Sequence, residues 1–196
     1  MRKVKVDLTL SGRQLEREIQ RTALKGQRFR YFRNLISVIL VCSAIVVLVS
    51  VFWFPVFQVT GNSMEPNLKR GQFVVASRGG TVAYGDMVAL HFENQILIRR
   101  VIGMPGDWIY IDDQGNISIN NNILEETYLS EKVRGRSDLS YPYQVPDGTY
   151  FVMGDKRSVA LDSRRSSMGC IRMDKIAGKI TFCIWPINEI KCFGWR

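Results

Sequence analysis

Hydrophobic and polar residues follow different patterns in the two parts of this chain. Residues 35–54 are apolar and carry no charge, and about 20 such residues match the hydrocarbon thickness of a bilayer. Upstream, residues 4–10 alternate as in a short extended piece, and apolar residues then recur at helical spacing over residues 11–35. The pattern therefore predicts a basic helix, capped by Ser11, that leads into a membrane-length helix.

Downstream of the apolar run, short segments rich in β-branched and aromatic residues alternate with glycine, proline and asparagine turns. The predicted strands are residues 73–77, 87–92, 96–102, 108–111, 117–119, 149–153 and 176–184. No helix of convincing length is expected there. The sequence thus predicts a mainly β domain with an antiparallel, partly closed, barrel-like sheet and a polar loop near residues 130–146.

Two interpretations fit the apolar run: a cleavable signal peptide or a retained anchor. A retained anchor is favoured because the run is long and ends in bulky residues, of which Trp53 and Phe54 suit a membrane interface. We expect three regions: a basic cytoplasmic segment at 1–34, a transmembrane helix at 35–56 and an extracytoplasmic domain at 57–196.

Charge is concentrated before the predicted span. Residues 1–34 hold ten basic and three acidic residues, a net +7 of the chain's +9. By the positive-inside rule this segment stays in the cytoplasm, so the chain is expected to be a single-pass protein of the cell membrane that also contacts anionic lipid. Nucleic-acid binding is not expected, because the charge adjoins the bilayer and no recognition motif accompanies it.

Cysteine and histidine spacing gives no metal motif. Cys170, Cys183 and Cys192 follow the span, where at most one disulfide can form among them, and we choose 183 with 192. His91 is the single histidine and is read as a structural strand residue, so neither a zinc site nor any other cofactor is expected.

Candidate chemistry begins just after the span, at Gly61-Asn62-Ser63-Met64-Glu65-Pro66. Gly61 permits unusual backbone angles and Pro66 fixes φ, so Ser63 is predicted to lie on a rigid turn. Taken alone, the pattern is more typical of an ordinary surface turn.

Two further segments change that interpretation: RRVIGMPGDWIYI at 99–111 and MGDKRSVALDSR at 153–164. In this order after an N-terminal anchor, the three segments resemble the boxes of bacterial type I signal peptidases, over the span and essentially all of residues 55–186. The resemblance implies a serine endopeptidase that removes signal peptides from exported preproteins, with Ser63 as nucleophile. It implies an oxyanion site at Ser63 and Gly61, and binding of an extended substrate strand along Gln58, Val59, Leu97 and Ile98. Its supporting residues are Arg100, Asp155, Arg157, Ala160, Asp162 and Arg164.

The sequence departs from the family pattern at the general base. The family places a neutral, buried lysine at position 99, where this chain has Arg99, and a guanidinium effectively never loses its proton. Ala160 replaces the serine that orients that lysine, and Lys156 stands where asparagine is more usual.

Two hypotheses remain open. In the first, the chain is a signal peptidase in which Lys156 or water handles proton transfer. In the second, it is a degenerate homologue that binds exported proteins, or assists surface-protein assembly, without cleaving them. An artificial replacement of a lysine by Arg99 would reconcile the two but leaves Ala160 unexplained. The expected partners are preproteins and the bilayer, and contact with the secretion machinery is possible.

Overall fold

The computed structural model describes residues 12–193, with side chains from residue 30 onward. The predicted extended piece at residues 4–10 and the cap at Ser11 lie outside this range. The chain divides into two compact units between Val49 and Ser50, which are described separately.

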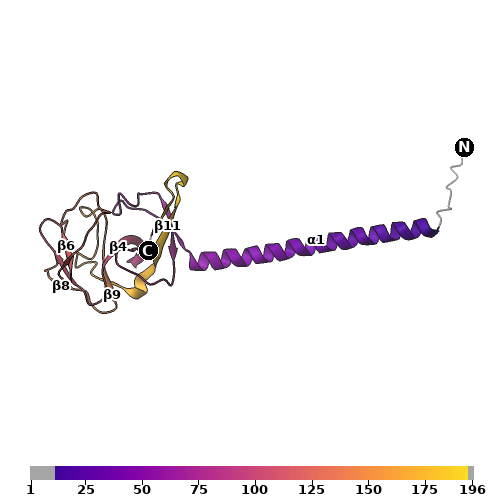
Figure 1. Cartoon of the computed structure of the whole chain (residues 1–196). Coiled ribbons are helices and arrows are strands. Elements are labelled where there is room, and N and C mark those ends of the chain that lie inside the picture. Colours follow the sequence, from indigo (N-terminus) through magenta and orange to yellow (C-terminus); the bar gives the residue numbers. More distant parts are fainter. Residues whose placement is uncertain (1–11, 194–196) are drawn as a thin grey trace. The chain divides into compact units, whose positions relative to one another are not determined.

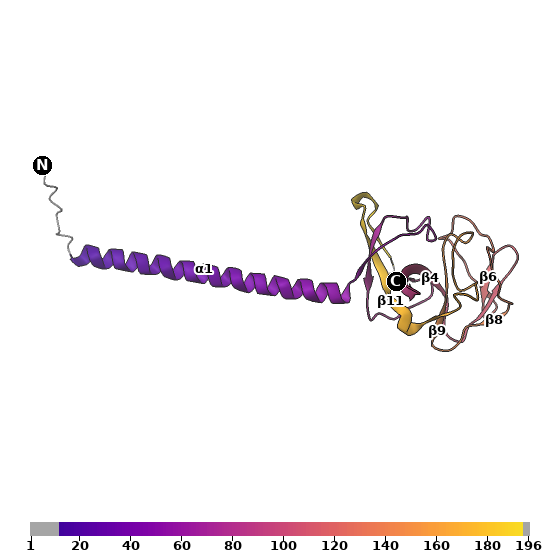
Figure 2. The same ribbon diagram turned by 180° about the vertical axis from the view of Figure 1, so that it is seen from behind.

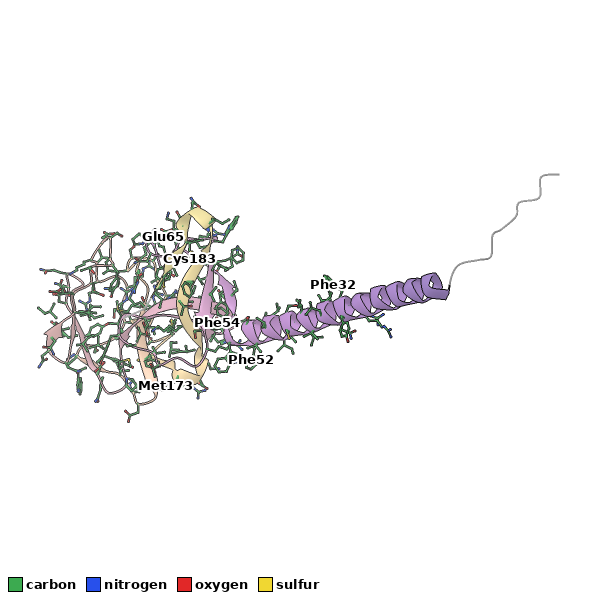
Figure 3. All side chains as sticks on the ribbon, turned by 45° about the vertical axis from the view of Figure 1, so that its right-hand side comes forward. Phe32, Phe52, Phe54, Glu65, Met173 and Cys183 are labelled. Carbon is green, nitrogen blue, oxygen red and sulfur yellow. The ribbon has the colours of Figure 1, made fainter. Side chains whose placement is uncertain are left out.

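The first unit consists of most of helix α1, which runs without a break from Gly12 to Trp53 (Figure 1). Its segment Arg30–Trp53 is the one helix in the described chain that is long and apolar enough to cross a membrane. Side chains project outward along it, as Phe32 does (Figure 3), and Phe32 is 67% exposed. Exposed apolar side chains such as these need another apolar environment, as a bilayer provides.

The second unit contains two antiparallel sheets. The larger has the order β1-β2-β11-β3-β4-β9-β10, with β12 paired to β11, and the smaller has the order β7-β6-β5-β8. The strands are β1 (Val56–Gln58), β2 (Phe73–Ser77), β3 (Met87–Phe92), β4 (Gln95–Gly103), β5 (Trp108–Ile111), β6 (Ile117–Ile119), β7 (Asn122–Ile123), β8 (Tyr143–Gln144), β9 (Thr149–Met153), β10 (Ile171–Arg172), β11 (Ile176–Trp185) and β12 (Lys191–Cys192). Figures 1 and 2 show β6 and β8 on one side of this unit and β11 on the other, with β4 and β9 between them.

The predicted mainly β, antiparallel fold is confirmed, and each of the seven predicted strands is present. Four of the five strands that the sequence pattern missed have two residues each, too few for an alternation to be visible, and the fifth, β1, directly follows the apolar run. Over the described residues the larger sheet is not closed into a barrel, because its pairing begins at β1 and ends at β10. Short 3₁₀ turns at Met173–Lys175 and Ile187–Glu189 are the helical elements described after α1.

Strand β4 is the centre of the larger sheet. It pairs with β3 along residues 95–100, whereas β9 pairs with it only from Arg100 onward. Residues 98–103 are all buried because both faces of the strand are covered. The second edge of residues 96–98 is therefore left without a strand partner in the described chain.

The expected disulfide between Cys183 and Cys192 is wrong for this structure, in which both are free thiols. In the β11–β12 hairpin Cys192 stands opposite Phe182, and Cys183 stands opposite Lys191. Neighbouring residues of a strand point to opposite faces, so the two thiols lie on opposite sides of the hairpin. Cys183 is buried in the core, whereas Cys192 is exposed.

Candidate active site

Ser63 lies in a turn between β1 and β2 that is anchored on both sides. Met64 and Leu68, the apolar residues of this turn, are 1% and 0% exposed, and the Leu68 amide donates to the Met64 carbonyl at 2.9 Å. The Lys156 amide donates to the Ser63 carbonyl at 2.9 Å, which ties the turn to the loop after β9. Ser63 itself remains half-buried, so the serine is held rigidly while its side chain stays accessible.

Arg99, on β4, makes direct contact with Ser63. Its Nη1 donates to Ser63 Oγ at 2.8 Å and to the Ile98 carbonyl at 2.5 Å, while Nε donates to the Leu161 carbonyl at 2.8 Å. The side chain is buried, and this loss of solvation lowers the pKa of the Arg99 guanidinium from its ordinary value. A guanidinium still has no acceptor atom, so Ser63 Oγ accepts the hydrogen bond, and no base contacts its hydroxyl proton.

Three buried ion pairs support this site. Arg100 binds Asp155 through two nitrogens, at 2.8 and 2.6 Å, and Arg164 binds Asp162 at 2.8 Å. The third pair joins Arg157 to Glu126. A buried charge is tolerated when it is paired and hydrogen-bonded, and each of these arginines meets that condition.

A second layer of polar contacts connects the pairs. The Arg100 guanidinium stacks on Tyr128, with Cζ 4.0 Å from the ring centroid, and the Tyr128 hydroxyl donates to Glu126 at 2.5 Å. Burial raises the pKa of the Tyr128 hydroxyl, which therefore stays a donor. Asn67 donates to Asp155 at 2.8 Å, so the turn that carries Ser63 is also bound to this network.

Arg99 differs from the other three buried arginines in having no carboxylate partner. Among the described residues its hydrogen bonds go to two carbonyl oxygens and one hydroxyl, and no ion pair includes it. Burial lowers the pKa of Arg99 more than the nearby charges of Asp162 and Asp155 raise it, since both carboxylates are already paired with other arginines. This environment favours a neutral side chain at that position.

Ala160 and Gly154 form the wall behind Ser63. A Cβ added to Gly154 would lie 2.4 Å from Ala160 Cβ, 2.8 Å from the Ser63 carbonyl oxygen and 3.6 Å from Ser63 Cβ. The Gly154 amide donates to the Asp162 carboxylate at 3.0 Å, and this hydrogen bond fixes the backbone at residue 154. Only glycine therefore fits at 154, and position 160 is close to the serine.

The Lys156 side chain makes no hydrogen bond to Ser63, for which the sequence left it open as an alternative general base. Its Nζ forms an ion pair with Glu65 at 2.7 Å, in the turn marked in Figure 3, and makes no hydrogen bond to Ser63 in the described chain.

The predicted substrate-binding residues lie together around one cleft. This cleft, with a volume of about 440 Å³, has Ser63 and Arg99 among its lining residues. The other residues that line it are Gln58, Val59, Thr60, Gly61, Asn62, Met64, Gln95, Ile96, Leu97, Ile98, Val159 and Leu161. The predicted oxyanion residue Gly61 and all four predicted substrate-binding residues thus line the same cleft as Ser63. His91 lines a separate depression.

Sequence reasoning missed Glu126, Tyr128 and Asn67. Glu126 and Tyr128 lie in the irregular segment between β7 and β8, where no periodicity marks a buried position. Asn67 follows Pro66 in the Ser63 turn and could have been noticed there as a residue that commonly binds backbone groups in turns.

An antiparallel β domain in which a serine and a buried basic side chain line one cleft has the arrangement of a serine hydrolase that works without histidine. The family model described as "Signal peptidase, peptidase S26" matches residues 32–185. The chain belongs to this signal peptidase family.

Two relatives in sequence agree with this assignment. A signal peptidase I of Bacillus amyloliquefaciens is 33% identical over 166 residues, which cover 78% of this chain and 88% of the relative. Signal peptidase IB of Staphylococcus aureus (strain COL) is 32% identical over 174 residues, covering 78% and 89%. The crystal structure of a signal peptidase I from Enterococcus faecalis V583 is 28% identical, with a TM-score of 0.43, and the match covers 52% of this chain and 98% of that one.

Proposed function

We propose that this chain is a serine endopeptidase of the signal peptidase I type, which removes N-terminal signal peptides from exported preproteins with Ser63 as nucleophile. Family membership supports the activity, and the observation that carries the residue assignment is the position of Ser63. It stands on an anchored turn that lines the cleft, with Ser63 Oγ 2.8 Å from Arg99 Nη1, the side chain at the family's base position.

The substrate binds as an added strand. The edge of β4 at residues 96–98 has no strand partner on its second side, although the Ile98 carbonyl accepts from Arg99, and β1 is an edge strand whose continuation, Val59–Thr60, lines the same cleft. A peptide between them gains main-chain hydrogen bonds on an apolar floor. Its scissile carbonyl then lies at Ser63, whose N–H has no acceptor among the described residues and is free to stabilise an oxyanion with Gly61.

Proton transfer limits the rate in this proposal. Arg99 holds Ser63 in place but cannot accept its proton, and the Lys156 amine is bound to Glu65. Water is then the acceptor. Loss of a positioned base typically lowers the rate by about 10² to 10⁴, so we expect slow turnover.

The membrane arrangement is part of the same proposal: a cytoplasmic segment at 1–34, a span at 35–56 and an extracytoplasmic domain at 57–196. It is supported by the net +7 of residues 1–34 and by the apolar, exposed helix Arg30–Trp53. Anchoring in the bilayer confines the enzyme and a membrane-inserted preprotein to one surface and raises their effective concentration. Contact with the secretion machinery would follow from the same placement.

A second function is favoured by the charge of Arg99, which forms no ion pair in the described chain. A homologue that binds exported chains, or assists surface-protein assembly, needs the cleft but not the base. Both functions predict binding, and only the first predicts cleavage that depends on Ser63.

The test uses the full chain in lipid vesicles with a fluorogenic preprotein segment. We expect slow cleavage that Ser63→Ala abolishes and Lys156→Ala leaves unchanged. Cleavage that survives Ser63→Ala would exclude the serine mechanism. Peptide binding with no cleavage in any variant would favour the binding function, and loss of cleavage in Lys156→Ala would identify that lysine as the base.

A further inference from the structure

The Arg99 guanidinium has one nitrogen without a protein partner. Nη1 and Nε are bound to Ser63, Ile98 and Leu161, whereas Nη2 donates to no residue in the described part of the chain. Every fully buried side-chain nitrogen or oxygen in that part has a partner. Nη2 is therefore not fully buried, and Arg99 lines the cleft, where this nitrogen can donate to a ligand.

Ser63 presents a second donor at the same place. Because Ser63 Oγ accepts from Arg99, its own proton is not used in that contact and can be donated to a ligand. Arg99 is also the only charged residue among the described residues that line the cleft, and the rest are apolar or neutral. A ligand anion would meet a positive charge and no carboxylate.

We propose that this cleft retains a peptide by its free C-terminal carboxylate, with one oxygen on Arg99 Nη2 and the other on the Ser63 hydroxyl. A carboxylate matches both requirements of the site, since it neutralises the unpaired guanidinium and accepts from two neighbouring donors. An uncleaved peptide bond at the same point offers one neutral carbonyl oxygen. The cleft therefore discriminates in favour of a chain end.

This inference rests on the proposed function for the direction of the bound peptide. Hydrolysis of a peptide bond at Ser63 adds one water and leaves the upstream fragment with a new carboxylate at the position of the attacked carbonyl. That fragment is the released signal peptide. Arg99 thus makes the product the preferred ligand, so that product release joins proton transfer in limiting turnover.

The experiment compares two labelled peptides of identical leucine- and alanine-rich sequence, one ending in a free carboxylate and the other in a carboxamide. Neither has to be cleaved. Binding to the full chain in detergent is followed by fluorescence anisotropy at fixed ionic strength. Charge-assisted hydrogen bonds of this kind predict about 10- to 100-fold tighter binding of the acid.

Variants separate the contributions of the two donors. Arg99→Gln should reduce the preference to no more than about threefold, and Ser63→Ala should lower it by a few-fold while Arg99 stays in place. Arg172→Gln is the matched control, because Arg172 is an exposed arginine, paired with Asp174, outside the cleft lining. It should leave the preference unchanged. If Arg99→Gln does not fold, the inference is still tested by the ratio of the affinities for the acid and the amide peptide, measured in the unchanged chain and in Ser63→Ala.

Equal affinity for the two peptides, no binding of either, or a preference that survives Arg99→Gln would overturn the inference. Displacement of the acid peptide by millimolar acetate would do so too, since it would indicate a simple anion site. If the proposed function fails and the carboxylate inference holds, Ser63-dependent cleavage will be absent while the chain still binds the acid peptide more tightly than the amide.

Discussion

Replacing Arg99 by lysine together with Ala160 by serine should turn a slow enzyme into a faster one. The double change supplies a group that can lose its proton and a hydroxyl beside it, in a site that is otherwise assembled. Residue 99 is 4% exposed and forms no ion pair in the described chain, so burial would lower the pKa of the introduced lysine, as it does for Arg99, and would outweigh the opposing charges of Asp162 and Asp155.

The size of the gain follows from the charge state and position of the amine. A fully solvated lysine is neutral in about one molecule in 250 at pH 8, and burial without a counterion raises that fraction toward one half or more. Its Nζ would stand near the present guanidinium carbon, one bond behind the Nη1 atom that now contacts Ser63 Oγ at 2.8 Å. A base in that position is worth about 10² to 10⁴ in rate, so we expect at least a 100-fold rise.

The assay is initial-rate cleavage of a fluorogenic preprotein segment between pH 6 and 10. The rate of the double variant should rise with pH and level off once the introduced lysine is neutral. Arg99→Lys alone should gain less, and Ala160→Ser alone should gain nothing, since the serine then has no amine to orient.

Arg99→Met is the control that removes the cation without adding a base, and it should stay near the starting rate. The reasoning would be refuted if the double variant, with binding intact, cleaved no faster than about threefold above the starting protein. It would also fail if Arg99→Met gained as much as the double variant, because the charge and not the missing base would then limit the reaction.

Three further outcomes are expected elsewhere in the domain. Gly154→Ala should lower the free energy of unfolding by about 1–3 kcal/mol in urea titrations, and reduce cleavage, because the new methyl would come within 2.4 Å of Ala160 Cβ. Arg164→Met should cost about 3–5 kcal/mol in the same titrations, because it leaves the fully buried Asp162 carboxylate unpaired. Iodoacetamide should modify Cys170 more slowly than free cysteine at pH 8, as read by mass spectrometry, because burial raises the pKa of that thiol.

The long strands and the apolar helix could be predicted because their signals are local. Each of the seven predicted strands spans at least three residues with β-branched or aromatic character, and the helix from Arg30 to Trp53 carries a run of apolar residues. Side chains of a strand alternate in the structure as they do in the sequence, so pattern and burial agree. Strands of two residues carry too little of the pattern to be recognised.

The three sequence segments that form the site could be recognised in the sequence, but the contacts between them in space could not. Ser63 and Arg99 are 36 residues apart in the chain and meet because the Ser63 turn is tied to the loop after β9, while β9 pairs with β4. Glu126, the partner of Arg157, comes from an irregular segment with no signal of its own.

By itself, then, the sequence determined the membrane-length helix, the antiparallel β domain and the residue types at each position of the site, including a cation where a neutral base is expected. The tertiary structure decided which charges are paired. It places three arginines against three carboxylates, leaves Arg99 without an ion-pair partner in the described chain, and makes Arg99 part of the cleft lining. The reason is that charge compensation depends on distances between residues far apart in the chain, and those distances are set by packing and not by local pattern.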